Sequence, residues 1–115
     1  MKYMLLIHSD PTKWTDDPAE NAKTHAAYGA FTGSIIESGE FVAGDALEGT
    51  DTATTVRVRN GKTSTFDGPF AETKEVLGGF YVVDVKDLDR ALELAAQIPH
   101  AQIGSVEVRP VADMG

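Results

Sequence analysis

Two short segments of this chain are apolar on both alternating sides, and they constrain the fold more than any other feature. Residues 2–8 (KYMLLIH) direct Leu5 to one side of an extended chain and Leu6 to the other, and residues 78–85 (GGFYVVDV) repeat the pattern. Successive side chains of a strand point to opposite faces of its sheet, so a strand of this kind is covered on both faces. We therefore expect both segments to be central strands.

Two helices are expected, over residues 18–38 and 87–98. Asp17 and Asp87 suit the N-cap positions, because an aspartate side chain accepts a hydrogen bond from the unpaired N–H groups of the first turn. Gly39 suits the end of the first helix, since glycine readily adopts the left-handed conformation found there. The buried side of the first helix is predicted from residues at helical spacing: Thr24, Tyr28, Phe31 and Ile35.

A hairpin is expected in the middle of the chain. Residues 41–46 and 54–59 have the short, partly apolar pattern of strands. The dipeptide Asn60-Gly61 favours a two-residue turn, so residues 62–66 should return antiparallel to the strand before it. A rigid loop over residues 67–77 then leads into the second central strand.

The last strand is expected at residues 104–110, which completes a β-α-β-β-α-β order with an inserted hairpin. This is the ferredoxin-like arrangement of the α+β class. Residues 104–110 and 54–59 both alternate between apolar and polar side chains, so we place these two strands at the edges of the sheet. The 115 residues form a single domain, residues 1–115.

One face of this sheet has no helix to cover it. The two helices of the ferredoxin-like arrangement lie on the same face, and the opposite face still carries apolar side chains from both central strands. An exposed apolar area of that size marks an interaction surface. We expect a homodimer in which two sheets pack face to face and form a dimeric α/β barrel.

Charge and composition exclude several classes of function. The net charge is -8, from 10 basic and 18 acidic residues. A chain this acidic, without a basic cluster, is not suited to bind nucleic acid or an anionic membrane surface. It contains no cysteine, which excludes disulfides and thiolate chemistry and suits a cytoplasmic location. The first apolar run, ahead of His8, is too short for a signal peptide or a membrane span.

No sequence motif predicts a cofactor or a metal. The chain has no nucleophile elbow, no phosphate-binding glycine loop and no dinucleotide fingerprint. Its three histidines, His8, His25 and His100, are too widely spaced to predict a metal site. We expect neither group to be needed.

Nearly the whole chain resembles the DGPF-domain branch of the YCII-related (YciI-like) family. The matching segments follow the family's order: KYMLLIH (2–8), GEFVAGDAL (39–47), TTVRVR (54–59), DGPFAETKE (67–75), LGGFYVVDV (77–85), DLDRAL (87–92) and VEVRPV (106–111). The resemblance implies the same dimeric ferredoxin-like α/β barrel. It implies less about chemistry, since most members have no assigned reaction.

Three further expectations come from the resemblance. Some members of the wider superfamily resemble dehydrochlorinases or lyases that act on ring compounds. In the YciI branch, a histidine near the first helix paired with a nearby acid is the proposed reactive dyad. Members of the DGPF type are often associated with genes for extracytoplasmic-function sigma factors, which suggests a regulatory setting.

His25 and Asp67 are the candidate catalytic residues. A histidine exchanges protons near neutral pH, and Asp67 could orient its ring. Tyr28, one helical turn from His25, lies closer to the position of the YciI-type histidine and is a candidate ligand-binding residue. The alternatives are a half-exposed histidine without a role and an aspartate that serves only the turn Asp67-Gly68-Pro69.

Five more residues are candidates for binding a ligand. His8 ends the first strand on the same side as Met4, and Asp45 is a second acid that could meet His25. The others lie in the loop after the hairpin: Phe70, Glu72 and Lys74. Alternative roles for these residues are packing of His8, anchoring of the loop in the core by Phe70, and ion pairs of Glu72 or Lys74 with Arg57 or Arg59.

Two classes of function stay open from the sequence. The first is a homodimer that binds a small molecule, or a protein partner in sigma-factor-linked regulation, without catalysis. The second is a cofactor-independent acid–base enzyme, such as a lyase, an isomerase or a dehydrochlorinase, acting on a small cyclic substrate. No residue set in the chain demands catalysis.

Overall fold

The structure is a computed structural model that describes residues 1–114. It is an α+β fold with two α-helices, six strands and three short 3₁₀ helices. In chain order the elements are β1 (Lys2–Ser9), η1 (Pro11–Lys13), α1 (Pro18–Glu37), β2 (Phe41–Ala46), η2 (Thr50–Thr52), β3 (Thr54–Arg59), β4 (Lys62–Asp67), β5 (Val76–Asp84), α2 (Leu88–Gln97), η3 (Pro99–Gln102) and β6 (Gly104–Pro110). The predicted helices and strands are confirmed to within about two residues at each end.

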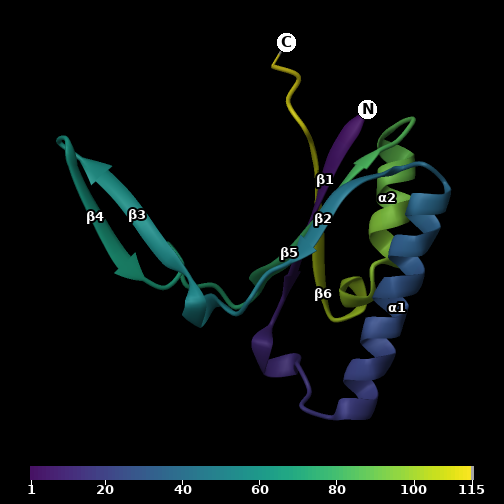
Figure 1. The fold of residues 1–115 in the computed structure, drawn as a ribbon, viewed down its shortest axis with the longest axis horizontal. Coiled ribbons are helices and arrows are strands. Elements are labelled where there is room, and N and C mark those ends of the chain that lie inside the picture. The colour runs from purple at the N-terminus through teal and green to yellow at the C-terminus, as the bar shows by residue number, and fades with distance from the viewer. Residues whose placement is uncertain (115) are drawn as a thin grey trace.

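Four strands form an antiparallel sheet in the order β2-β5-β1-β6. The two central strands are β1 and β5, as their apolar character on both sides predicts. Both helices cover the same face of this sheet (Figure 1). The arrangement is compatible with a ferredoxin-like fold.

The prediction that residues 54–59 form an edge of this sheet is wrong. β3 pairs only with β4, in a separate two-stranded sheet, and β2 takes the edge position beside β5. The turn is the predicted one, since Asn60 and Gly61 both have positive φ angles, 53° and 75°. The hairpin therefore forms as expected but extends away from the rest of the chain as an arm (Figure 1).

Both helices begin at the predicted aspartates. The Asp17 side chain accepts a hydrogen bond from the backbone N–H of Ala19, and Asp87 accepts one from the N–H of Arg90. Gly39, with φ 80°, ends the first helix as predicted. Caps of this kind fix where each helix starts and therefore which side chains face the sheet.

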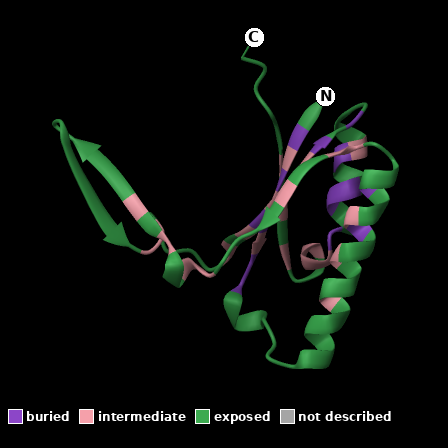
Figure 2. Ribbon diagram, in the orientation of Figure 1, coloured by how far each residue is buried: buried purple, intermediate pink, exposed green. Residues whose placement is uncertain are grey.

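The core lies between the sheet and the two helices (Figure 2). Its fully buried large side chains come from β1, α1, β5, α2 and the residue before η3: Leu5, Ile35, Val83, Leu94 and Ile98. On α1, Phe31 and Ile35 are buried, whereas Thr24 and Tyr28 are half-buried. The N-terminal half of α1 thus stands further from the core than its C-terminal half, and this leaves room for a cavity.

The opposite face of the sheet has an apolar centre, and no element within residues 1–114 covers it. Met4 and Leu6 on β1 pair with Val82 and Phe80 on β5, and all four side chains are only half-buried. The radius of gyration is 16.2 Å, against about 13 Å for a compact domain of this length. The extended arm accounts for this difference. We call this apolar surface (Met4, Leu6, Phe80 and Val82) the open face.

Candidate functional site

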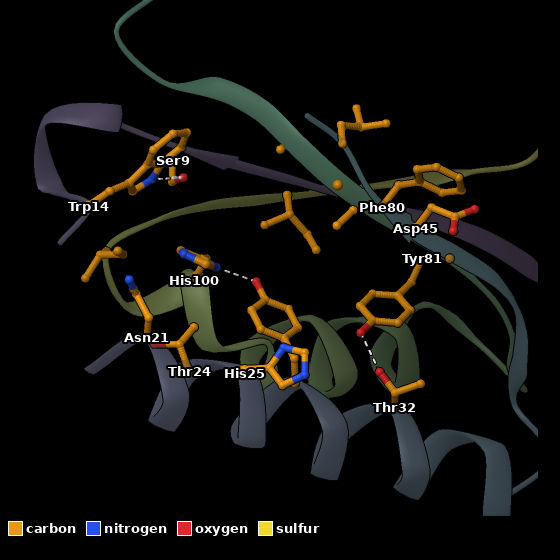
Figure 3. Close-up of a pocket in the computed structure, with 18 of the residues that line it drawn as sticks. Ser9, Trp14, Asn21, Thr24, His25, Thr32, Asp45, Phe80, Tyr81 and His100 are labelled. Atoms are coloured by element: carbon orange, nitrogen blue, oxygen red, sulfur yellow. Dashed lines mark hydrogen bonds between the residues drawn. The ribbon is translucent and has the colours of Figure 1, made fainter. Parts of the chain in front are cut away.

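A cavity of about 780 Å³ lies between the N-terminal half of α1 and the sheet (Figure 3). This volume is in the range of small-molecule binding sites. Residues from β1, η1, α1, β2, β5 and η3 line it: Ile7, Ser9, Lys13, Trp14, Thr15, Asn21, Thr24, His25, Tyr28, Thr32, Phe41, Gly44, Asp45, Ala46, Leu47, Gly78, Gly79, Phe80, Tyr81, His100 and Ile103.

Tyr28 and His100 form a hydrogen-bonded pair in the wall of this cavity. The Tyr28 hydroxyl lies 2.5 Å from Nδ1 of His100, and the two rings are 5.4 Å apart between centroids. Burial raises the pKa of Tyr28 to about 12 and lowers the pKa of His100. Both shifts favour the uncharged form of the side chain, because burial disfavours the phenolate of Tyr28 and the imidazolium of His100 alike. The pair is therefore neutral at neutral pH.

The titration of His100 tests this assignment. We expect its pKa to lie below the ordinary value of about 6.5 because burial disfavours the cation. The half-buried neutral ring contributes stability that is fully present above the unfolded pKa and is lost as pH falls through the lower folded pKa. Two-dimensional NMR of the histidine rings measures the pKa, and His100→Gln assigns the signal. A folded-state pKa above the ordinary value would contradict the neutral pair.

Trp14 lies at the cavity beside the end of β1. Its indole Nε1–H donates to the Ser9 hydroxyl oxygen at 2.8 Å, and Ser9 is buried (Figure 3). The preceding Asp10 accepts hydrogen bonds from the N–H and the hydroxyl of Thr12, which hold the pKa of the Asp10 carboxyl below its usual range. This cap forms the short helix η1, and η1 places the indole against the cavity.

Tyr81 forms the wall of the cavity next to the core. Its hydroxyl lies 2.6 Å from the Thr32 hydroxyl, and its ring meets Phe31 edge to face at 5.2 Å between centroids. Phe41 contacts the same ring at 6.4 Å. These contacts fix the ring on three sides, so this aromatic wall is rigid.

The structure brings three of the predicted site residues to one cavity. His25, Tyr28 and Asp45 all line it. Within residues 1–114 the structure records no hydrogen bond or ion pair between His25 and an acidic side chain. The cavity histidine with a hydrogen-bond partner is instead His100, and its partner is the Tyr28 hydroxyl.

Asp67 does not line the cavity that contains His25. It is the last residue of β4, paired with Thr54 at the base of the arm, and its side chain is exposed. Within one chain the structure therefore does not bring the proposed dyad together. The catalytic roles of Asp67 and His25 stay predictions.

His8 and Phe70 lie on the other side of the sheet. A second cavity, of about 540 Å³, is lined by both residues and by parts of the loops on either side of the arm. The prediction that Phe70 anchors its loop in the core is wrong, since Phe70 is 77% exposed. His8 is half-buried beside the open face, and its Nε2 lies 3.8 Å from a carboxylate oxygen of Glu107.

Glu72 and Lys74 are exposed in the loop between β4 and β5. Lys74 lies near enough to Asp10 for its charge to help lower the pKa of that carboxyl, after the hydrogen bonds from Thr12. The expected ion pairs with the arm are not formed in the described part of the chain. Arg57 instead lies over the Phe66 ring, with its guanidinium carbon 5.2 Å from the ring centroid.

His100 is the site residue that sequence reasoning missed. It follows Pro99 just after the second helix, 72 residues from Tyr28, and no local motif marks it.

Across residues 1–114 there is no cluster of three or more metal-ligand side chains. No helix in that same range combines the length and apolar character needed to cross a bilayer.

Comparison with known proteins identifies the family. The family model of the YCII-related domain matches residues 1–115. The chain belongs to the YCII-related family. This YCII-related protein is also 37% identical over 117 residues to an uncharacterised protein of Rhizobium meliloti (strain 1021), a match that covers 97% of this chain and 93% of the relative. The predicted membership of the YCII-related family is thus confirmed over the whole chain, and the assignment to its DGPF branch stays a prediction.

Proposed function

We propose that this YCII-related protein is a homodimer that binds a small molecule in the cavity between α1 and the sheet. The observation that carries the proposal is the cavity itself, of about 780 Å³, with polar groups that converge on apolar walls. Sites for small molecules have this composition, in which apolar walls supply affinity and a few polar groups fix orientation.

The aromatic walls of the cavity favour a flat ligand, and the Tyr28–His100 pair favours an uncharged group beside it. Five aromatic side chains line the cavity: Trp14, Tyr28, Phe41, Phe80 and Tyr81. Tyr28 and His100 are both neutral, so they offer hydrogen bonds but no charge to pair with an ion. A ring compound with one or two hydrogen-bonding oxygens matches these walls.

Trp14 provides a direct test of binding, because it is the chain's single tryptophan and lines the cavity. We expect titration with small uncharged ring ketones, such as cyclohexanone and β-tetralone, to change its fluorescence in a saturable way. Thr24→Phe projects a ring into the cavity from α1 and should strongly weaken the change. Ala27→Phe adds the same ring at an exposed position on the same helix and should keep it. Equal responses of both variants would contradict binding in this cavity.

The open face and the arm support the proposed homodimer. The open face consists of half-buried apolar side chains in the middle of the sheet, and a surface of this kind marks an interface. The arm carries further exposed apolar side chains, among them Val56, Val58 and Phe66. Two copies that pack open face to open face would cover both sheets, and each arm would reach over its partner. This is the dimeric α/β barrel expected from the sequence.

A further inference from the structure

We propose that His100 is a catalytic acid–base residue, positioned by Tyr28, which shifts a double bond in a small unsaturated ketone bound in the cavity. This inference rests on the proposed function, since it requires a ligand at this site. Three observations place the chemistry here. The His100 ring lines the cavity, its Nδ1 meets the Tyr28 hydroxyl at 2.5 Å, and its Nε2 has no recorded hydrogen-bond partner among residues 1–114.

The Tyr28 hydroxyl suits this role because its oxygen can accept a hydrogen bond from Nδ1–H in both states of the ring. Nδ1 carries a proton when Nε2 is free, and it keeps that proton when Nε2 has taken up another. The same hydrogen bond therefore holds His100 in place as it changes between base and acid. The dashed line that starts at His100 in Figure 3 marks this hydrogen bond. A carboxylate partner would instead add a fixed negative charge to the site.

The neutral state of His100 supplies the base at neutral pH. Burial lowers its pKa, so the lone pair is available without prior loss of a proton. The other titratable groups that line the cavity are Lys13, His25, Asp45 and Tyr81. The lowered pKa of His100 is caused by burial, so the position of the ring in the cavity wall keeps it in the neutral form that can accept a proton.

The proposed reaction balances without an oxidant, a reductant or a second substrate. Nε2 takes a proton from the carbon next to the carbonyl group, and the C–H electron pair forms a carbon–carbon double bond. The carbonyl π pair moves onto oxygen and gives a dienolate, while Nδ1–H of the imidazolium donates to Tyr28. Nε2 then returns the proton to the far end of the dienolate, and the carbonyl forms again. The net change is the position of one double bond.

Ser9 is placed to stabilise the negative oxygen of the dienolate. Its oxygen accepts the hydrogen bond from Trp14 Nε1, and its own O–H has no recorded acceptor among residues 1–114. Ser9 pairs with Gly104, which follows η3, the short helix that carries His100. Ser9 is buried and lines the cavity, and a hydroxyl that donates to developing negative charge lowers the barrier of such a step.

Exchange of ketone protons for deuterium tests the first half of the reaction. β-Tetralone and cyclohexanone are incubated with the dimeric protein in deuterium oxide, and proton NMR follows loss of the signals next to the carbonyl. Trp14 fluorescence measures binding of the same compounds. We expect the protein to accelerate exchange and His100→Gln to lower this acceleration by about 100-fold while fluorescence still reports binding. Gln102→Ala, a change at an exposed residue of the same short helix η3 outside the cavity lining, should leave exchange unchanged.

Tyr28→Phe distinguishes positioning from packing. It should slow exchange and move the pH midpoint of exchange to a lower value, because Nδ1–H of the cation loses its hydrogen-bond acceptor. Binding without acceleration, or acceleration that survives His100→Gln in a folded variant, would overturn this inference and leave the proposed function standing. Failure of both ketones to change Trp14 fluorescence, together with no exchange, would overturn both.

Discussion

Leu6→Lys is expected to convert the proposed dimer to a monomer. Leu6 lies in the middle of the open face, paired with Phe80 on one side and with Glu107 on the other. In the proposed dimer the new ammonium group would be buried between two sheets, at an effective penalty of several kcal/mol for each ion. In a single chain the lysine lies on the surface, opposite Glu107, where opposite charges on neighbouring strands are favourable. The substitution therefore acts against the interface and not against the fold.

Light scattering measures this result directly. The wild-type protein should have twice the chain mass of 12.3 kDa at micromolar concentration, and Leu6→Lys should have the single mass. Ile36→Lys makes the same change at an apolar residue on α1 that is 57% exposed, and it should stay dimeric. A wild-type protein of single mass, or a Leu6→Lys variant of double mass, would contradict the proposed packing of the open faces.

The sequence predicts the sheet well because its signals are local. The two segments that are apolar on both sides became β1 and β5, the central strands, and the dipeptide Asn60-Gly61 formed its turn. Alternation of side chains could not predict the place of β3. An edge strand and an exposed arm both alternate, and only pairing between distant residues separates them.

Only one member of the Tyr28–His100 pair could be predicted from the sequence. The helical spacing that places Phe31 and Ile35 in the core also directs Tyr28 toward the sheet, so this half of the pair follows from the sequence. His100 reaches Tyr28 because η3 turns the chain back beside the end of β1, and that approach depends on tertiary packing. Asp67 drew attention through its turn motif. Turn chemistry determines the local backbone conformation, and it does not predict which distant residues lie near the Asp67 side chain.

The approach of η3 to β1 depends on Gly104, and Gly104→Ala is expected to lower the free energy of unfolding by about 1–3 kcal/mol. A Cβ at this position would lie 2.1 Å from the backbone oxygen of His8 and 3.0 Å from Cα of Ser9. Both atoms belong to the backbone of the central strand β1, so neither can move without loss of sheet hydrogen bonds. The start of β6 must shift instead, and η3 shifts with it.

This shift should be visible at the candidate site as well as in stability. Displacement of η3 exposes His100, so its pKa should rise toward the ordinary value in the NMR titration, and the fluorescence of Trp14 beside Ser9 should change. Gly33→Ala is the matched control, because a Cβ there meets nothing within 4 Å and alanine in a helix is about 0.5–1 kcal/mol more stable than glycine. Denaturant unfolding measures both variants. Equal stability of Gly104→Ala and the wild type would mean that β6 and β1 approach less closely at this point, and the position of His100 would then need another cause.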